Sequence, residues 1–207
     1  MTRRRRRERG VALVEIAIVA PIVFALVFGI MEYGLTFRDQ LTAQDAVGDA
    51  ARLGAIVGPD VTSTGSNADY EILRTLRDGL GNVPTSWIVR IVVFKGSAGG
   101  AGAPERQIPV SCRNGTAIAG TCNVFDVNSA FNAVQSGDFA YFDCPATPGS
   151  PSCPWPPSGR NDGPNPNVID YLGVYVKIQR PGLTGLFGSV RTVERAAIVR
   201  LEPGATE

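Results

Sequence analysis

Apolar residues run almost without interruption from position 11 to position 37, broken only by Glu15, Pro21 and Glu32. A helix needs about 20 residues to cross a bilayer. A helix that is apolar on every face is typical of a membrane span rather than of a surface helix. The pattern therefore predicts a transmembrane helix over residues 11–37.

Residues 38–57 continue with a helical period but separate into an apolar and a polar side. The apolar positions recur at steps of three and four residues: Leu41, Ala43, Ala46, Val47, Ala50, Gly54 and Val57. This spacing places them on one face of a helix, and Gly58 with Pro59 should end it. We therefore expect one continuous helix from 11 to 57, about 70 Å long at 1.5 Å per residue, whose outer half packs against another element.

Three later segments alternate apolar and polar residues as half-buried strands do. They are SWIVRIVVFK (86–95), VIDYLGVYVKIQRP (168–181) and SVRTVERAAIVRLEP (189–203). A short helix is expected over 67–82, with Asn67 as its candidate N-cap. Three strands can form a small antiparallel sheet that covers the outer part of the long helix. The predicted fold class is therefore α+β.

The segment 96–167 is rich in Gly, Pro and Asn and contains all four cysteines. The pairs Cys112 with Cys122 and Cys144 with Cys153 are too widely spaced for zinc sites, which prefer two to four intervening residues. Two disulfides in an oxidising compartment explain the cysteines better than four free thiols. Proximity alone favours these local pairings, although four cysteines allow three. A disulfide would help to pin a segment with so few apolar residues.

Charge is concentrated at the start of the chain. Residues 1–10 contain six arginines and one acid, and the rest of the chain has 14 basic and 18 acidic residues. Nucleic-acid binding requires a basic face on the folded domain, so we expect no nucleic-acid partner. A basic leader before an apolar helix stays cytoplasmic. Residues 38–207 should then be extracytoplasmic, in a single-pass protein of the cytoplasmic membrane with its N-terminus inside. A secretory signal fits less well, because FGIMEYGLTF offers no small-residue cleavage site.

No catalytic arrangement is evident in the sequence. Histidine is absent, so the commonest general base and metal ligand are both missing. The glycines of KGSAGGAGAP do not have the order of a phosphate-binding loop, and no G-x-S-x-G nucleophile motif is present. We expect no enzymatic activity, no metal and no cofactor.

Glu15 is the residue of the apolar segment that most needs an explanation, because an unpaired carboxylate in a membrane helix is costly. A cut between Gly10 and Val11 would create a charged amine on Val11. Glu15 would then lie one helical turn away, at i+4. The amine and the acid could neutralise each other within one subunit or between neighbours, which favours a role in assembly rather than in catalysis.

The sequence RERG followed by VALVE resembles the processing site of type IV prepilin-like proteins. These have a basic leader, a glycine at its last position and a glutamate five residues after the cut. The longer stretch RGVALVEIAIVAPIVFALVFGIMEYG, together with LTAQDAVGDAARLGA, VYVKIQRP and AIVRLEP, is similar to the TadE-like family of the tight-adherence (Flp) pilus system. The resemblance covers about the first 57 residues well and the last 40 loosely.

This resemblance implies a pilin-like fold and a minor pilin or pseudopilin that acts in pilus initiation and assembly. Its partners would be a prepilin peptidase, other pilins and pilus assembly proteins, and an assembled subunit would be extracellular. By matching position, Gly10 ends the leader, Val11 is the new N-terminus and Glu15 is the assembly acid. The alternative is an unprocessed single-pass membrane protein with an extracytoplasmic protein-binding domain. An exported enzyme is the least favoured hypothesis.

Overall fold

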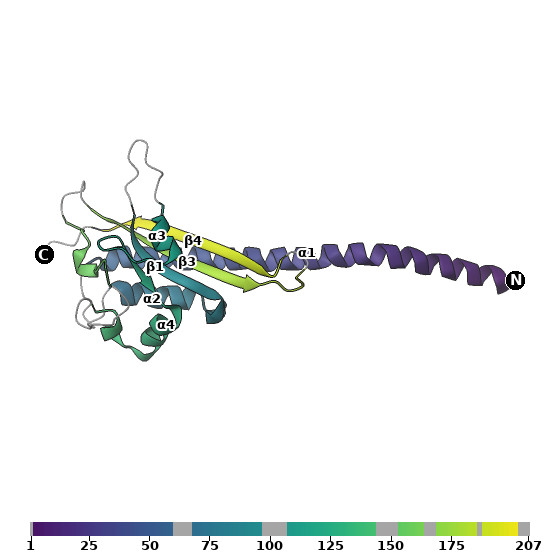
Figure 1. Cartoon of the computed structure of the whole chain (residues 1–207), viewed down its shortest axis with the longest axis horizontal. Coiled ribbons are helices and arrows are strands. Elements are labelled where there is room, and N and C mark those ends of the chain that lie inside the picture. The colour runs from purple at the N-terminus through teal and green to yellow at the C-terminus, as the bar shows by residue number, and fades with distance from the viewer. Residues whose placement is uncertain are drawn as a thin grey trace, which may run out of the picture.

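The computed structural model describes residues 2–59, 68–96, 107–143, 153–163, 169–185 and 188–202, with side chains from Ala12 onward. Figure 1 shows a long N-terminal helix, one half of which stands clear of the body while the other half lies along a small sheet. The long apolar helix followed by an antiparallel sheet confirms the predicted α+β class.

The N-terminal helix α1 runs as one element from Thr2 to Val57. It begins earlier than the predicted start at position 11, because arginine is a good helix former and the basic leader continues the helix. Pro21 lies inside α1 without ending it, although a proline removes one backbone hydrogen bond. Gly58 has a φ of 63° and its N–H donates to the carbonyl of Gly54 at 3.0 Å, which ends the helix as predicted.

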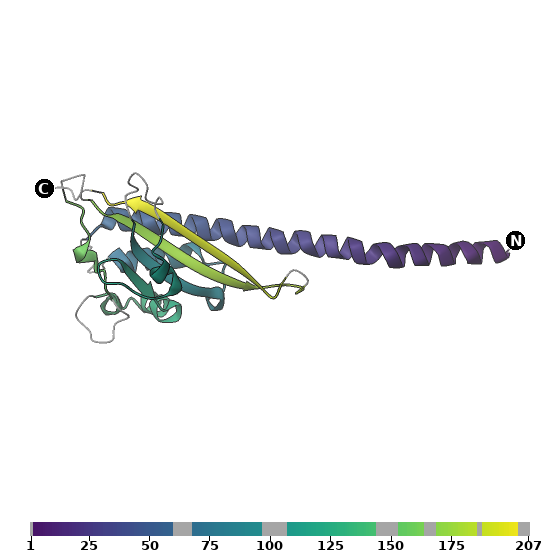
Figure 2. The same cartoon turned by 45° about the horizontal axis from the view of Figure 1, so that its top comes forward.

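Four antiparallel strands form one sheet in the order β2-β1-β3-β4. They are β1 (Ile88–Gly96), β2 (Cys122–Phe125), β3 (Tyr171–Pro181) and β4 (Val190–Arg200). Strands β1, β3 and β4 are the three that the sequence predicted, and β2 is an additional short strand on the outer side of β1. The β3–β4 hairpin extends past the other strands, along α1 toward the N-terminus (Figures 1 and 2).

Shorter helices complete the domain. They are α2 (Ala68–Gly79), α3 (Val110–Asn114) and α4 (Val127–Ser136), with 3-10 turns at Thr85–Trp87, Phe139–Tyr141 and Pro157–Gly159. Helix α2 is the predicted short helix, and its candidate cap Asn67 lies outside the described residues. Helix α4 was not predicted. Its N-terminus is capped by Asp126, whose carboxylate accepts the N–H of Ser129 at 2.9 Å.

The main core lies between one face of the sheet and the helices α1, α2 and α4. Most of the predicted apolar stripe of α1 is buried there, whereas Leu41 is exposed. At Gly54, α1 lies close to both α2 and β3. A β-carbon at Gly54 would lie 2.4 Å from Leu172 Cδ2 and 2.5 Å from Ile72 Cδ1. A residue without a side chain is therefore needed where α1 meets α2 and β3.

A second, smaller cluster covers the opposite face of the sheet. Val92, Phe94 and Tyr175 are buried there beneath α3. A disulfide joins Cys112 of α3 to Cys122 of β2, with their Cα atoms 6.2 Å apart. This bond holds α3 on the sheet where apolar contacts are few.

The second cysteine pair lies only partly within the described residues. Cys153 is disulfide-bonded, while Cys144 lies outside the described residues. The Cys144–Cys153 pairing therefore stays a prediction.

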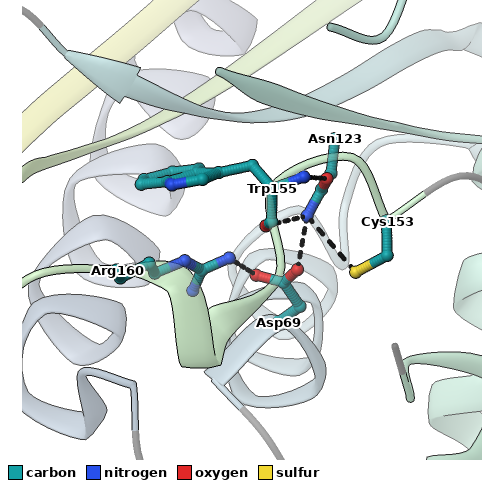
Figure 3. A network of polar contacts seen from close by, with 5 residues as sticks. All are labelled: Asp69, Asn123, Cys153, Trp155 and Arg160. Carbon is teal, nitrogen blue, oxygen red and sulfur yellow. Dashed lines mark hydrogen bonds and ion pairs between the residues drawn. The ribbon is translucent and has the colours of Figure 1, made fainter. Parts of the chain in front are cut away.

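A buried polar network fixes the proline-rich segment after Cys153 to the sheet and to α2 (Figure 3). Asn123 donates to the carbonyl of Trp155 at 2.8 Å and to Asp69 Oδ2 at 2.9 Å, and its own carbonyl oxygen accepts the Trp155 N–H at 2.9 Å. Asp69 also pairs with the buried guanidinium of Arg160, which lies over the Trp155 ring. Asn123 and Asp69 are thus matched by partners inside the network, whereas only one nitrogen of the Arg160 guanidinium is, because its Nε and Nη1 are buried without a hydrogen-bond partner among the described residues.

Candidate functional site

The free half of α1 is the most unusual surface of the molecule. From Ala12 to Met31 almost every residue is exposed although the sequence is strongly apolar. The exposed large side chains are Leu13, Val14, Ile16, Ile18, Val19, Ile22, Val23, Phe24, Leu26, Val27, Phe28, Ile30 and Met31. A protein in water rarely leaves such a continuous apolar surface uncovered. By length and composition this helix is a candidate membrane span.

Glu15 lies within this apolar surface and is exposed. Among the described side chains, none forms a hydrogen bond or ion pair with it. Gly10 and Val11 belong to the same unbroken helix, so the backbone places Val11 one turn before Glu15. The side chain of Val11 lies outside the described residues. The three predicted site residues thus lie together at the start of the free half of α1.

The other end of the free half is marked by a second acid, Glu32, which is only 4% exposed. Its carboxylate accepts the N–H of Leu183 at 2.9 Å and the hydroxyl of Thr184 at 3.4 Å. Both partners belong to the connection between β3 and β4. The hairpin therefore covers α1 from Glu32 onward, which leaves the 20 residues from 12 to 31 uncovered, a length of about 30 Å.

A third acid of α1 is also buried by the hairpin. Asp39 is 1% exposed and accepts from Arg180 Nη1 at 2.9 Å, with Arg38 Nε at 3.5 Å from its other oxygen. The Arg180 guanidinium also lies 5.3 Å from the centre of the Trp87 ring. An ion pair with so little solvent around it needs good geometry and further contacts to be stable, and here a cation–π contact supplies one.

Sequence reasoning missed the roles of Glu32 and Asp39. It placed Glu32 inside the span and Asp39 just beyond the end of the apolar run. The signal that could have revealed them was two acids on an otherwise apolar helix and a hairpin connection rich in glycine at 182–189. Their partners lie about 140 to 150 positions away along the chain, which no local pattern can connect.

An ion cluster lies on the sheet face that carries α3. Glu194 forms two ion pairs: its Oε1 lies 3.0 Å from Lys177 Nζ, and its Oε2 lies 2.8 Å from Arg113 Nη2. Partial burial alone would raise the pKa of Glu194, but the hydrogen bond from Lys177 and the charges of Lys177 and Arg113 outweigh it and lower this pKa. Burial, together with the charge of Glu194, raises the pKa of Tyr175 to about 12. Neither pKa is adjusted for proton exchange near neutral pH. The contacts of Glu194 join β4 to Lys177 of β3 and to Arg113 of α3.

The described residues offer little for chemistry. No group of three or more Cys, Asp or Glu side chains among them is placed to hold a metal ion. An open hollow of about 370 Å³ lies beside the end of α2, lined by Arg77, Asp78, Leu80, Gly81, Val83, Thr85, Ile88 and Phe131. The charged residues of its lining are one cation, Arg77, and one carboxylate, Asp78. The lining contains no activated nucleophile.

A long apolar helix continues into a small α+β domain, and this defines the class: a protein whose described residues contain one candidate membrane span and one globular domain. Residues 10–52 match the family model described as TadE-like protein. This match confirms the resemblance to the TadE-like family over the part of the chain that holds Gly10, Val11 and Glu15. No curated protein and no solved structure matches the chain. The family match points to a protein associated with the tight-adherence pilus.

Proposed function

We propose that this protein is a minor pilin or pseudopilin of a tight-adherence (Flp) pilus system and acts in pilus initiation and assembly. One observation carries the proposal. The stretch that matches the TadE-like family model contains a glycine, Gly10, and an exposed acid, Glu15, at the start of an uncovered apolar helix. A helix that is open on all sides in the isolated chain is free to pack against lipid and then against neighbouring helices.

The proposed span covers residues 12–31, which is shorter than the 11–37 expected from hydropathy. The shorter span is preferred because Glu32 is already bound by the hairpin connection, and 20 helical residues match the roughly 30 Å hydrocarbon layer. The arginine leader keeps the N-terminus in the cytoplasm. The globular domain is then extracytoplasmic, where its disulfide can persist.

The proposed processing step is hydrolysis between Gly10 and Val11 by a prepilin peptidase. It removes the arginines and leaves a protonated amine on Val11. An acid near a helix N-terminus is also favoured by the exposed N–H groups there. The amine and Glu15 then neutralise each other, either within the subunit or across the contact with a neighbouring pilin. The cost of placing a carboxylate in the membrane drives this pairing.

The experiment that tests this proposal is mass spectrometry of the N-terminus of the full-length protein isolated from membranes, with and without a co-expressed prepilin peptidase. A start at Val11 that appears only with the peptidase is the expected result. An intact arginine leader in both samples would contradict processing. It would favour the alternative, a permanent single-pass protein with an extracytoplasmic protein-binding domain.

A further inference from the structure

The β3–β4 hairpin ends beside Glu32, just after the last residue of the uncovered part of α1, which is residues 12–31. Figures 1 and 2 show the hairpin reaching farther toward the N-terminus than any other part of the sheet. Its connection is fixed there by Glu32, which accepts the Leu183 N–H at 2.9 Å. If residues 12–31 fill the hydrocarbon layer, the end of the hairpin lies at the outer surface of the membrane.

The hairpin end is held closely against the helix. A β-carbon at Gly182 would lie 2.3 Å from the carbonyl oxygen of Gly188 and 3.0 Å from Glu32 Oε1. The Gly182 N–H donates to the carbonyl of Ser189 at 2.8 Å. The two strands therefore close onto Glu32 only because position 182 has no side chain.

The surface around this contact has the composition of a membrane interface. Four large side chains are more than half exposed: Tyr33 and Phe37 on α1, and Leu183 and Val190 on the hairpin. Arg191 lies 5.3 Å from the centre of the Tyr33 ring, and the side chain of Arg38 is 58% exposed. Aromatic and apolar side chains mixed with arginine suit the headgroup layer, where tyrosine rings are enriched and cations approach lipid phosphates.

We propose that Leu183 and Val190 of the β3–β4 hairpin, together with Tyr33 and Phe37 of α1, form a second membrane contact that lies in the phospholipid headgroup layer. This inference rests on the membrane span of the proposed function. Two facts favour lipid over a protein partner: the surface is continuous with the apolar half of α1, and its exposed charge at Arg38 is complementary to phosphate. Glu32 keeps the two membrane contacts at a fixed separation, so the domain stands on the membrane at a defined height.

The test uses the full chain reconstituted into vesicles of phosphatidylcholine and phosphatidylglycerol, some of whose acyl chains carry bromine close to the headgroup. Bromine quenches tryptophan fluorescence on contact, so Leu183→Trp reports the depth of the hairpin end. Each variant is compared with the parent chain, which contains Trp87 and Trp155. Phe28→Trp is the control inside the proposed span. Ile56→Trp is the matched exposed control, about 36 Å farther along α1 than Glu32.

The expected result is loss of most of the added fluorescence for Leu183→Trp and Phe28→Trp, and none for Ile56→Trp. If Phe28→Trp is quenched and Leu183→Trp behaves like Ile56→Trp, the hairpin contact is overturned while the span stands. The hairpin end would then face solvent or a protein partner. If Phe28→Trp is not quenched either, both the span and the hairpin contact are overturned.

Discussion

Arg180, near the end of β3, donates from Nη1 to Asp39 Oδ2 in α1 at 2.9 Å, across 141 positions of the chain. The side chains of Asp39 and Arg180 are 1% and 12% exposed. Together with the contact of Glu32 to the hairpin connection, this pair joins the sheet to the helix at two points about two turns apart. These two contacts thereby join α1 to the β3–β4 hairpin just beyond the proposed membrane surface.

Replacing Asp39 by Ala should lower the free energy of unfolding of the globular domain by about 3 kcal/mol, because Arg180 would stay buried without its carboxylate partner. Chemical denaturation of the detergent-solubilised full chain, followed by tryptophan fluorescence, measures the change. Asp49→Ala is the matched control, since the Asp49–Arg52 pair on the same helix is largely exposed and should contribute less than about 1 kcal/mol. Equal losses for the two variants would contradict the assigned role of Asp39.

Gly54→Ala should destabilise the domain by about 1–3 kcal/mol, because the new methyl group would overlap Leu172 and Ile72. Both neighbours are fully buried, and a side chain in a closely packed core can shift only by displacing others. Gly48→Ala is the control on the same helix. A β-carbon at Gly48 meets nothing within 4 Å, so alanine there should be neutral or stabilise by up to about 1 kcal/mol through helix propensity. The melting temperature of the Gly54→Ala variant should fall, whereas that of the Gly48→Ala variant should stay the same or rise.

The pKa of Glu194 predicts an acid-dependent part of the stability. Its pKa is lowered in the folded protein, so folding favours the charged carboxylate. The contribution of Glu194 is therefore present above its ordinary value of 4.5 and is lost as the pH falls through the lower folded pKa. Glu194→Gln should flatten the pH dependence of the unfolding free energy in this acidic range and leave its slope near neutral pH unchanged. An unaltered slope below pH 4.5 in the variant would show that Lys177 and Arg113 do not act on Glu194 as described.

Local patterns were sufficient to predict α1, α2 and the three long strands, because each of these elements shows its period over many residues. They were insufficient for β2, which has only four residues, Cys122–Phe125. Helix α4 did carry a readable signal, since Asp126 is a good N-cap and Val127, Ala130, Phe131 and Val134 recur at helical spacing. The glycine- and proline-rich composition around it obscured that signal.

Within the candidate site, the sequence could predict those residues that depend only on neighbours close to them in the chain. Gly10, Val11 and Glu15 lie within six positions, and one helix is enough to relate them. The roles of Glu32 and Asp39 depend on their contacts with Leu183 and Arg180. The β3–β4 hairpin brings these two partners back alongside α1. Such contacts depend on the tertiary fold, and a period of two or of 3.6 residues contains no information about them.

Glu15→Ala should abolish incorporation of the protein into pili while leaving its insertion in the membrane intact. The reason is that the apolar free half of α1 remains, whereas the partner for the amine of Val11 is lost. Glu15→Gln is the sharper variant, because it keeps the shape of the side chain and removes only its charge, and it should show the same loss. Immunoblots of sheared pili and of membrane fractions measure both quantities.

The control is Asp45→Ala, which removes an exposed acid on the outer half of α1. This variant should assemble normally. Normal pili with Glu15→Gln would leave Glu15 without a role in assembly, whatever the N-terminus of the mature protein.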